Sequence, residues 1–313
     1  MQRTKRLTEG AVLSGLYIVL LLLVLFIPFL GTILLWFLPL PFIIYVVRHG
    51  LKPGLLMFTV TLLLSILIGA GIGLPFTLLA GAGGVTAGTL IHMKKEALLV
   101  LAGTSIANIS ALTLLYAGSV LILDIDPLSV MQDIMRDSVT QAESMLGAMG
   151  QEPSENLDMF NEMITQVGYM GPLIIAFTGI AFAGLSQGIA HIVLRRLKTP
   201  AEPFPPFREW NFPRSLLWYY LITSIIFYIG MEEEGSPLFI VVWNLFPLLE
   251  TAMAIQGFSV VFYYCYKKSI TKAVPIIMLI SGLVLPIILL FARILGIIDL
   301  GFHLKKRMET DKK

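Results

Sequence analysis

The chain of 313 residues contains a single cysteine, Cys265, and four histidines. One cysteine excludes an intrachain disulfide and any CxxC site for metal or redox chemistry. The HExxH metalloprotease motif and the GxxxxGK[ST] nucleotide-binding loop are also absent. We therefore expect no enzyme, no catalytic residue, no metal and no cofactor. Transport powered by ATP would need ATPases as separate proteins.

Charge is scarce as well, because only 13% of the residues are charged, against roughly 25% in soluble domains. The alternation of apolar and polar residues that marks a membrane β-barrel is missing. Hydrophobic residues instead make up 57% of the chain, and many stand in runs near the 20 residues that cross a bilayer as a helix. We predict an all-α integral membrane protein with spans at 8–27, 32–47, 53–69, 74–92, 97–123, 168–194, 215–231, 238–266 and 273–298. The first is a retained span, since no small-residue cleavage site follows it.

The positive residues between these spans predict the orientation of the chain. If the loops alternate sides, one side receives Arg3, Lys5, Arg6, Arg48, Lys52, Lys94, Lys95, Arg195, Arg196, Lys198, Arg208, Arg214, Lys267, Lys268 and Lys272. Positive residues in short loops mark the cytoplasm, so we expect a cytoplasmic N-terminus. Nine full spans would place Lys305–Arg307 outside, against this rule. The stretch 273–304 is therefore either one span with an interfacial tail or a re-entrant pair broken at Pro286.

Two segments outside the predicted membrane are unusual. Residues 124–167 hold nine acidic residues and one basic residue, and their apolar positions recur at helical spacing. We expect two amphipathic helices there, on the outer side. Residues 199–214 interleave prolines with aromatics, which predicts an extended cytoplasmic linker at the headgroup level. This linker separates a module at 1–198 from a helical membrane module at 215–313; the prolines are Pro200, Pro203, Pro205, Pro206 and Pro213.

Six spans with both ends cytoplasmic, a first helix rich in small residues and a long outer segment before the sixth span resemble a known arrangement. Residues 1–198 are similar to the substrate-binding S component of energy-coupling-factor vitamin transporters. The whole chain most resembles the YybS-like family of bacterial polytopic membrane proteins, which is related to that fold. The resemblance implies the bacterial cytoplasmic membrane and partners in the form of a membrane coupling subunit and ATPases. It also implies that Ala11 and Gly15, a small-xxx-small pair, dock the coupling subunit.

Polar residues inside the spans are candidate ligand-binding residues, because they are costly in a bilayer. Span 97–123 carries Thr104, Ser105 and Asn108, the last two sharing a helix face. They either contact a ligand that enters from outside or form interhelical hydrogen bonds. Glu250 is central in span 238–266 and is predicted to face the bundle interior, with Arg293 as one candidate partner.

Three hypotheses about function follow. The leading hypothesis is binding of an unidentified small organic molecule from the outer side, with import as a further step. The alternative is a membrane scaffold or regulatory partner that transports nothing. A proton-coupled carrier using Glu250 ranks third, since the inverted repeats of many carriers are not evident. We expect the lipid bilayer, and no nucleic acid, as a partner.

Overall fold

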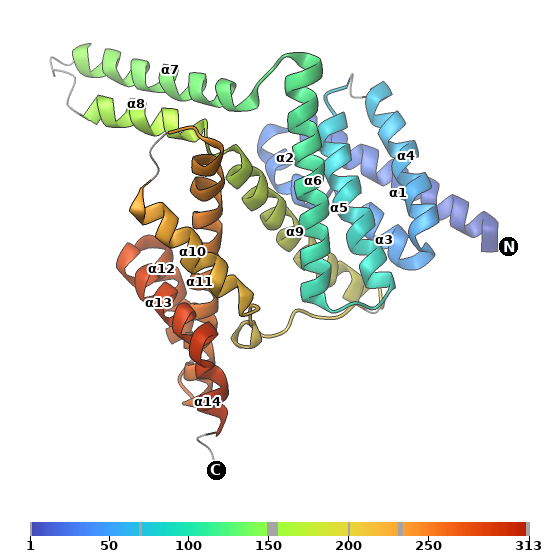
Figure 1. Ribbon diagram of the computed structural model, residues 1–313. Helices are drawn as coiled ribbons and strands as arrows, with labels where there is room; N and C mark the ends of the chain where they lie inside the picture. The colour runs from blue at the N-terminus through green and yellow to red at the C-terminus, as the bar shows by residue number, and fades with distance from the viewer. Residues whose placement is uncertain (1, 69–70, 149–155, 200, 231–233, 311–313) are drawn as a thin grey trace. The chain divides into compact units, whose positions relative to one another are not determined.

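The computed structural model describes residues 2–68, 71–148, 156–199, 201–230 and 234–310. In these ranges the chain forms helices joined by short connections, with no strand (Figure 1). Contacts divide the chain into two compact units: unit 1 comprises Met1–Asp133 and Ile174–Phe204, and unit 2 comprises Ile134–Leu173 and Pro205–Lys313. The last boundary between the units, after Phe204, falls inside the predicted linker at 199–214. Most of the segment 124–167, predicted to lie on the outer side, belongs to unit 2. The predicted module 1–198 included this segment in the N-terminal part.

Unit 1 contains most of the predicted N-terminal spans. Its helices are α1 (Gln2–Phe26), α2 (Pro28–Leu34), η1 (Leu35–Phe37), α3 (Leu40–His49), α4 (Leu51–Ile68), α5 (Leu74–His92), α6 (Ala97–Leu123) and most of α9 (Gly171–Arg196). Helices α5 and α6 have the predicted bounds, and the others differ from the prediction by a few residues. Gly69, predicted as the last residue of the third span, lies outside the described residues.

The predicted span at 32–47 is interrupted in the structure. Pro28 begins α2 at its first turn, where the missing N–H costs nothing. Residues 28–31, which separate the first two predicted spans, are therefore helical. Gly31 fits there because an added Cβ would lie 2.5 Å from the carbonyl oxygen of Val24. Before Pro39 the chain passes through the 3₁₀ turn η1 and then enters α3. Proline, which cannot donate to the helical ladder, explains this division.

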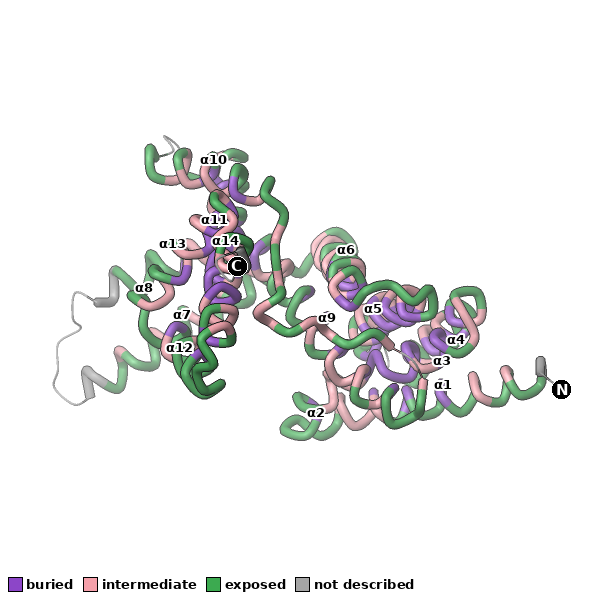
Figure 2. Tube along the Cα trace, turned by 90° about the horizontal axis from the view of Figure 1, so that it is seen from below, coloured by how far each residue is buried: buried purple, intermediate pink, exposed green. Residues whose placement is uncertain are grey.

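The core of unit 1 lies among α1, α3, α4 and α5. The Tyr17 ring is fully buried, packs against Phe42 with 4.8 Å between ring centroids, and donates its hydroxyl to Thr77 Oγ1 at 2.8 Å. Figure 2 shows buried residues gathered on α3 and α5, whereas much of α6 is exposed. Leu121 and Ile122 of α6 are 83% and 82% exposed. Large apolar side chains facing outward are expected where lipid is the solvent.

One end of unit 1 collects positive residues. Arg48 and His49 at the end of α3 pair with Glu9 of α1. The Nδ1 atom of His92, at the end of α5, lies 2.8 Å from the carbonyl oxygen of Val47. We call this the basic end of unit 1; the opposite end holds the start of α5 and the end of α6.

Unit 2 contains the rest of the helices. They are α7 (Pro127–Ala148) from Ile134 onward, α8 (Asn156–Val167), the first turn of α9, η2 (Phe207–Glu209), α10 (Ser215–Ile229), α11 (Pro237–Lys267), α12 (Ala273–Val284), α13 (Pro286–Phe302) and α14 (Leu304–Thr310). The two helices predicted in the outer segment are α7 and α8; residues 149–155 between them, and Pro200 of the linker, lie outside the described residues.

The last apolar stretch is a broken helix pair. Helices α12 and α13 are bent by 115° at Leu285, whose extended backbone is the conformation favoured before proline. Helix α13 then runs beside α11 in the same direction, since Arg293 contacts Glu250 and Asp299 contacts Gln256. The following α14 ends beside Lys267, whose Nζ donates to the carbonyl oxygen of Met308. The pair thus starts and finishes at the same end of α11, which matches the re-entrant alternative.

Seven helical segments of the described residues are long and apolar enough to cross a membrane, if α2, η1 and α3 count together as one, Pro28–His49. The bent pair would be an eighth if counted as one span. Helix α10, predicted as a span, has 15 residues and is therefore about 22 Å long, shorter than the roughly 30 Å of a bilayer core. The chain is an all-α integral membrane protein, as predicted.

Candidate functional site

The polar face predicted on α6 is buried between helices of unit 1. Thr104, Ser105 and Asn108 are 1%, 7% and 0% exposed. The Asn108 amide donates to the carbonyl oxygen of Gly179 on α9 at 3.3 Å, and an added Cβ at Gly83 of α5 would overlap its side-chain oxygen. These contacts are those of interhelical packing, one of the two predicted alternatives. Among the described residues, Thr104 Oγ1 and Asn108 Oδ1 have no hydrogen-bond partner.

A sequence pattern of hydrolases occurs on α9 without their geometry. Residues 184–188 read Gly-Leu-Ser-Gln-Gly, which matches GxSxG. In hydrolases this motif forms a sharp turn between a strand and a helix, which exposes the serine. Here Ser186 is buried within the helix and donates to the carbonyl oxygen of Phe182 at 2.5 Å. The pattern therefore offers no nucleophile.

The largest described pocket of unit 1 lies at the end opposite the basic residues. Its volume is about 760 Å³, within the usual range for small-molecule sites. The walls come from the starts of α5 and α7, the second half of α6 and Ile175 of α9: Gly71, Leu74, Pro75, Leu78, Leu112, Leu114, Leu115, Tyr116, Gly118, Ser119, Ile122, Leu123, Pro127 and Ile175. Thr104, Ser105 and Asn108 lie elsewhere along α6.

The two polar side chains of this pocket wall are engaged by the chain itself. The Tyr116 hydroxyl donates to Asp126 Oδ1 at 3.0 Å, and Ser119 Oγ donates to the carbonyl oxygen of Ile125 at 2.8 Å. Asp126 also accepts from the backbone N–H of Leu128, so it caps the start of α7. Burial raises the pKa of Asp126, but the hydrogen bonds that its carboxylate accepts outweigh this effect and lower the pKa below its ordinary value. A ligand in this pocket would contact hydrocarbon on nearly all sides.

Ala11 and Gly15 lie on the exposed side of α1 and line a groove of about 380 Å³ between α1 and α4. Nothing lies within 4 Å of an added Cβ at Gly15. The small residues are thus not occupied by packing within unit 1. Their role in docking a partner stays a prediction.

Glu250 and Arg293 form an ion pair in unit 2. The Arg293 guanidinium donates to Glu250 Oε1, and the two side chains are 20% and 24% exposed, respectively. Arg293 Nε is buried without a hydrogen-bond partner among the described residues. An embedded carboxylate almost always has such a partner. A role of the pair in ligand binding stays a prediction.

The ion pair lies beside a close helix crossing that sequence reasoning missed. An added Cβ at Gly257 of α11 would overlap the carbonyl oxygen of Ala292, and one at Gly296 of α13 would overlap that of Met253. The two backbones are therefore in direct contact, as small residues permit. The spacing of Ala292 and Gly296, four residues apart in an apolar stretch, is the signal that predicts such a contact.

A buried polar network, also missed, closes one end of unit 2. The fully buried Gln256 donates to Asp299 Oδ2 at 2.5 Å and accepts from the backbone N–H of Phe212 at 3.0 Å. Lys305 Nζ donates to the carbonyl oxygen of Trp210 at 2.5 Å and lies 3.8 Å from Asp299 Oδ2. Burial, only partly offset by Asp299, lowers the pKa of Lys305. The network joins residues 205–214 of the predicted linker, which we call the Pro/aromatic segment, to α11, α13 and α14.

Residues 15–300 match a family described as "predicted membrane protein" (DUF2232). The chain belongs to this family. The DUF2232 match starts inside α1 and ends near the end of α13, so it covers both units. A relative from Bacillus subtilis (strain 168), named "Uncharacterized protein YybS", is 33% identical over 311 residues, which cover 99% of this chain and 100% of the relative. This agrees with the predicted YybS-like membership.

No solved structure matches the chain. The similarity of residues 1–198 to S components therefore stays a prediction. What is established is a multi-pass, helical membrane protein of the DUF2232 family.

Proposed function

We propose that this protein binds an apolar or amphiphilic small molecule in the pocket at the end of unit 1 opposite its basic residues. The pocket of about 760 Å³ is the observation that carries this proposal. Because its tyrosine and serine donors are already engaged, the favoured ligand buries hydrocarbon and makes few directed hydrogen bonds. Since positive loops face the cytoplasm, the pocket lies at the outer leaflet, where a lipid-soluble molecule reaches it directly.

The proposed site differs from the one expected on sequence grounds. The expected site used the polar face of Thr104, Ser105 and Asn108, which packs against α5 and α9. The pocket lies further along α6, around Gly118. Import powered by ATP is a second step of the proposal and requires a partner, because the chain lacks a nucleotide-binding loop. The groove beside Ala11 and Gly15 is the surface we assign to that partner.

The test fills the pocket without changing its charge. Gly118 lines the pocket, and nothing lies within 4 Å of an added Cβ there, so Gly118→Phe places a ring in the cavity. Gly188 on α9 is equally open but does not line it, which makes Gly188→Phe the matched control. Wild type and both variants are purified gently from native membranes, and their organic extracts are compared by mass spectrometry.

We expect one compound in stoichiometric amount in wild type and Gly188→Phe, and at least about tenfold less in Gly118→Phe, which corresponds to about 1.4 kcal/mol of binding free energy. Equal retention by Gly118→Phe would place the ligand elsewhere. Recovery of partner proteins without any retained compound would instead support the scaffold hypothesis.

A further inference from the structure

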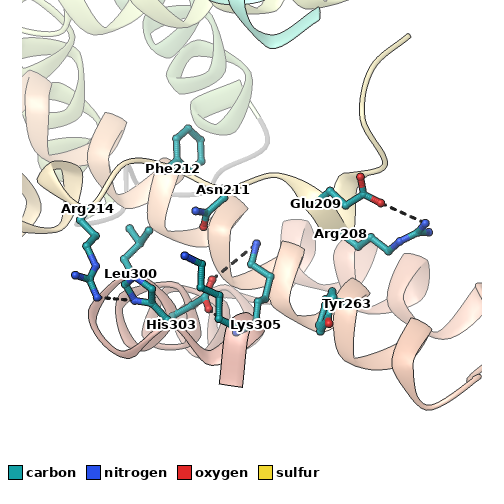
Figure 3. A pocket seen from close by; sticks show the side chains of 11 residues that line it. Arg208, Glu209, Asn211, Phe212, Arg214, Tyr263, Leu300, His303 and Lys305 are labelled. Carbon is teal, nitrogen blue, oxygen red and sulfur yellow. Dashed lines mark hydrogen bonds and ion pairs between the residues drawn. The ribbon is translucent and has the colours of Figure 1, made fainter. Parts of the chain in front are cut away.

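A second cavity, in unit 2, has the opposite chemistry. It measures about 270 Å³ and lies where the Pro/aromatic segment meets α11, α13 and α14. Figure 3 shows side chains that line it, with Arg214 beside His303. Lys305 Nζ lies 3.8 Å from Asp299 Oδ2. The lining residues are Arg208, Glu209, Asn211, Phe212, Arg214, Tyr263, Asp299, Leu300, His303, Lys305 and Lys306.

The lining carries an excess of positive charge. Four cationic side chains face two carboxylates, so two positive charges remain when His303 is neutral. Each carboxylate is close to a cation: Asp299 lies 3.8 Å from Lys305, and Glu209 lies 3.4 Å from Arg208. The Arg208 guanidinium is also stacked 3.9 Å from the centre of the Tyr266 ring. The positive excess is thus a property of the lining as a whole, in which Arg214 lies directly beside His303.

His303 lies in direct contact with a cationic side chain of the lining. Arg214 Nη2 lies 2.8 Å from His303 Nδ1, a geometry in which the guanidinium donates to a neutral imidazole. Desolvation, together with the charges of Arg214 and Lys306, lowers the pKa of His303 below its ordinary value. The backbone of His303 is left-handed, with φ of 57°, which turns the chain from α13 into α14. The turn keeps Lys305 and Lys306 at the cavity.

Aromatic residues place the cavity at a membrane surface. Trp218 and Tyr219, in the first turns of α10, are 64% and 59% exposed, and Tyr264 and Tyr266, at the end of α11, are also exposed. Exposed tryptophan and tyrosine at helix ends mark the headgroup layer. Arg214 directly precedes α10, and Tyr263 of α11 lines the cavity, so the cavity lies at headgroup depth.

We propose that this cavity binds a phosphate group, with Arg214, His303 and Lys306 as the contacting side chains and an anionic phospholipid headgroup as the source. Guanidinium and ammonium groups form strong charge-assisted hydrogen bonds to phosphate. Basic pockets between membrane helices on the cytoplasmic side are suited to anionic headgroups. Bound phosphate would fix the Pro/aromatic segment to the end of α13. The site is separate from the apolar pocket of unit 1.

The experiment uses the full-length protein in a neutral detergent, with bound lipid counted by native mass spectrometry. One arm titrates phosphatidylglycerol, a second titrates zwitterionic phosphatidylcholine, and a third adds inorganic phosphate as a competitor. The variant is Arg214→Gln with Lys306→Gln. Both side chains are exposed, so the fold should persist. The control, Lys268→Gln with Lys272→Gln, removes two equally exposed charges outside the cavity lining.

We expect phosphatidylglycerol to bind more tightly than phosphatidylcholine, and the Arg214/Lys306 variant to lose at least about tenfold in affinity. The Lys268/Lys272 control should stay within about twofold. Equal losses in both double variants would show a general attraction of the surface for anions and would overturn the proposal. So would equal binding of the two lipids without competition by phosphate. Competition by inorganic phosphate at equal affinity would support the phosphate site but make free phosphate its ligand.

Discussion

A carboxylate in the middle of a membrane helix must be neutralised by a proton or by a cation. Glu250 uses Arg293, and the two charges are taken from water at a considerable desolvation cost. Such a pair adds little net stability against two neutral residues, but breaking it leaves one charge buried. The pairing was foreseeable, because Arg293 is the only cation within the last apolar stretch at 273–298.

Glu250→Gln should therefore destabilise unit 2 by about 2 kcal/mol, less than a fully buried pair because both side chains are partly exposed. The melting temperature in detergent should fall by roughly 5 °C. The double variant Glu250→Gln with Arg293→Met removes both charges and should melt close to wild type. Glu209→Gln, which breaks an exposed pair, is the control and should change little. A Glu250→Gln protein as stable as Glu209→Gln would show that the pair is immaterial.

Gln256, Asp299 and Lys305 show the limit of residue-level prediction. Each is visible in the sequence as a polar group in or beside an apolar stretch. Their convergence depends on α13 returning beside α11, which places residues 43 apart within hydrogen-bond distance. Hydropathy and periodicity along one segment carry no information on that pairing.

Single helices were well predicted where apolar length and a clear stop coincide. Helix α6 begins after Glu96 and ends before Asp124, as the charges at both ends indicate. Elements that begin or break at a proline were harder to predict. Pro28 starts a helix where a turn was expected, and Pro286 reverses the chain where the sequence allowed a single span. A proline restricts the local backbone, but neighbouring helices decide whether it makes a start, a kink or a reversal.

The contact of α11 with α13 predicts a strict size limit at Gly257. Gly257→Ala adds one methyl group against the backbone of Ala292, which cannot move aside as a side chain can. We expect a loss of about 3 kcal/mol, the upper end for overpacking. Gly301→Ala, near the end of α13, meets only Leu217 Cδ2 at 3.7 Å and should be neutral or slightly stabilising. Thermal unfolding of both variants in detergent distinguishes them, and equal melting temperatures would contradict direct backbone contact.

The exposed small residues of α1 give a second prediction for an element. Ala11→Leu with Gly15→Leu should leave folding intact, because nothing in unit 1 lies near an added Cβ at Gly15. The two leucine side chains would then prevent a partner helix from approaching α1 closely. Pull-down from native membranes should then lose a membrane partner that wild type recovers. Val12→Leu with Val19→Leu, which enlarges other exposed positions of α1, is the control. Unchanged recovery of partners would remove Ala11 and Gly15 as the docking surface.

For the whole molecule, composition and spans predicted the helical membrane class and a resemblance predicted the family, whereas neither predicted the path of the C-terminus. Charge counting left Lys305–Arg307 as an exception to the positive-inside rule. In unit 2 these residues lie at the same end as Arg208, Arg214 and Lys267, because α13 returns beside α11. The exception disappears if α12 and α13 are a re-entrant pair, because Lys305–Arg307 then lie on the same side as the other positive loops.

We therefore predict that the C-terminus is cytoplasmic. The only cysteine, Cys265, is buried, so single-cysteine labelling is practicable in a Cys265→Ala background. Lys306→Cys and Lys95→Cys, both exposed at basic ends, should react with a membrane-impermeant maleimide only after the cells are permeabilised. Ser138→Cys, exposed on α7, should react in intact cells. If Lys306→Cys instead labels from outside while Lys95→Cys does not, α12 and α13 cross the membrane as one span, and the phosphate site would face the outer surface.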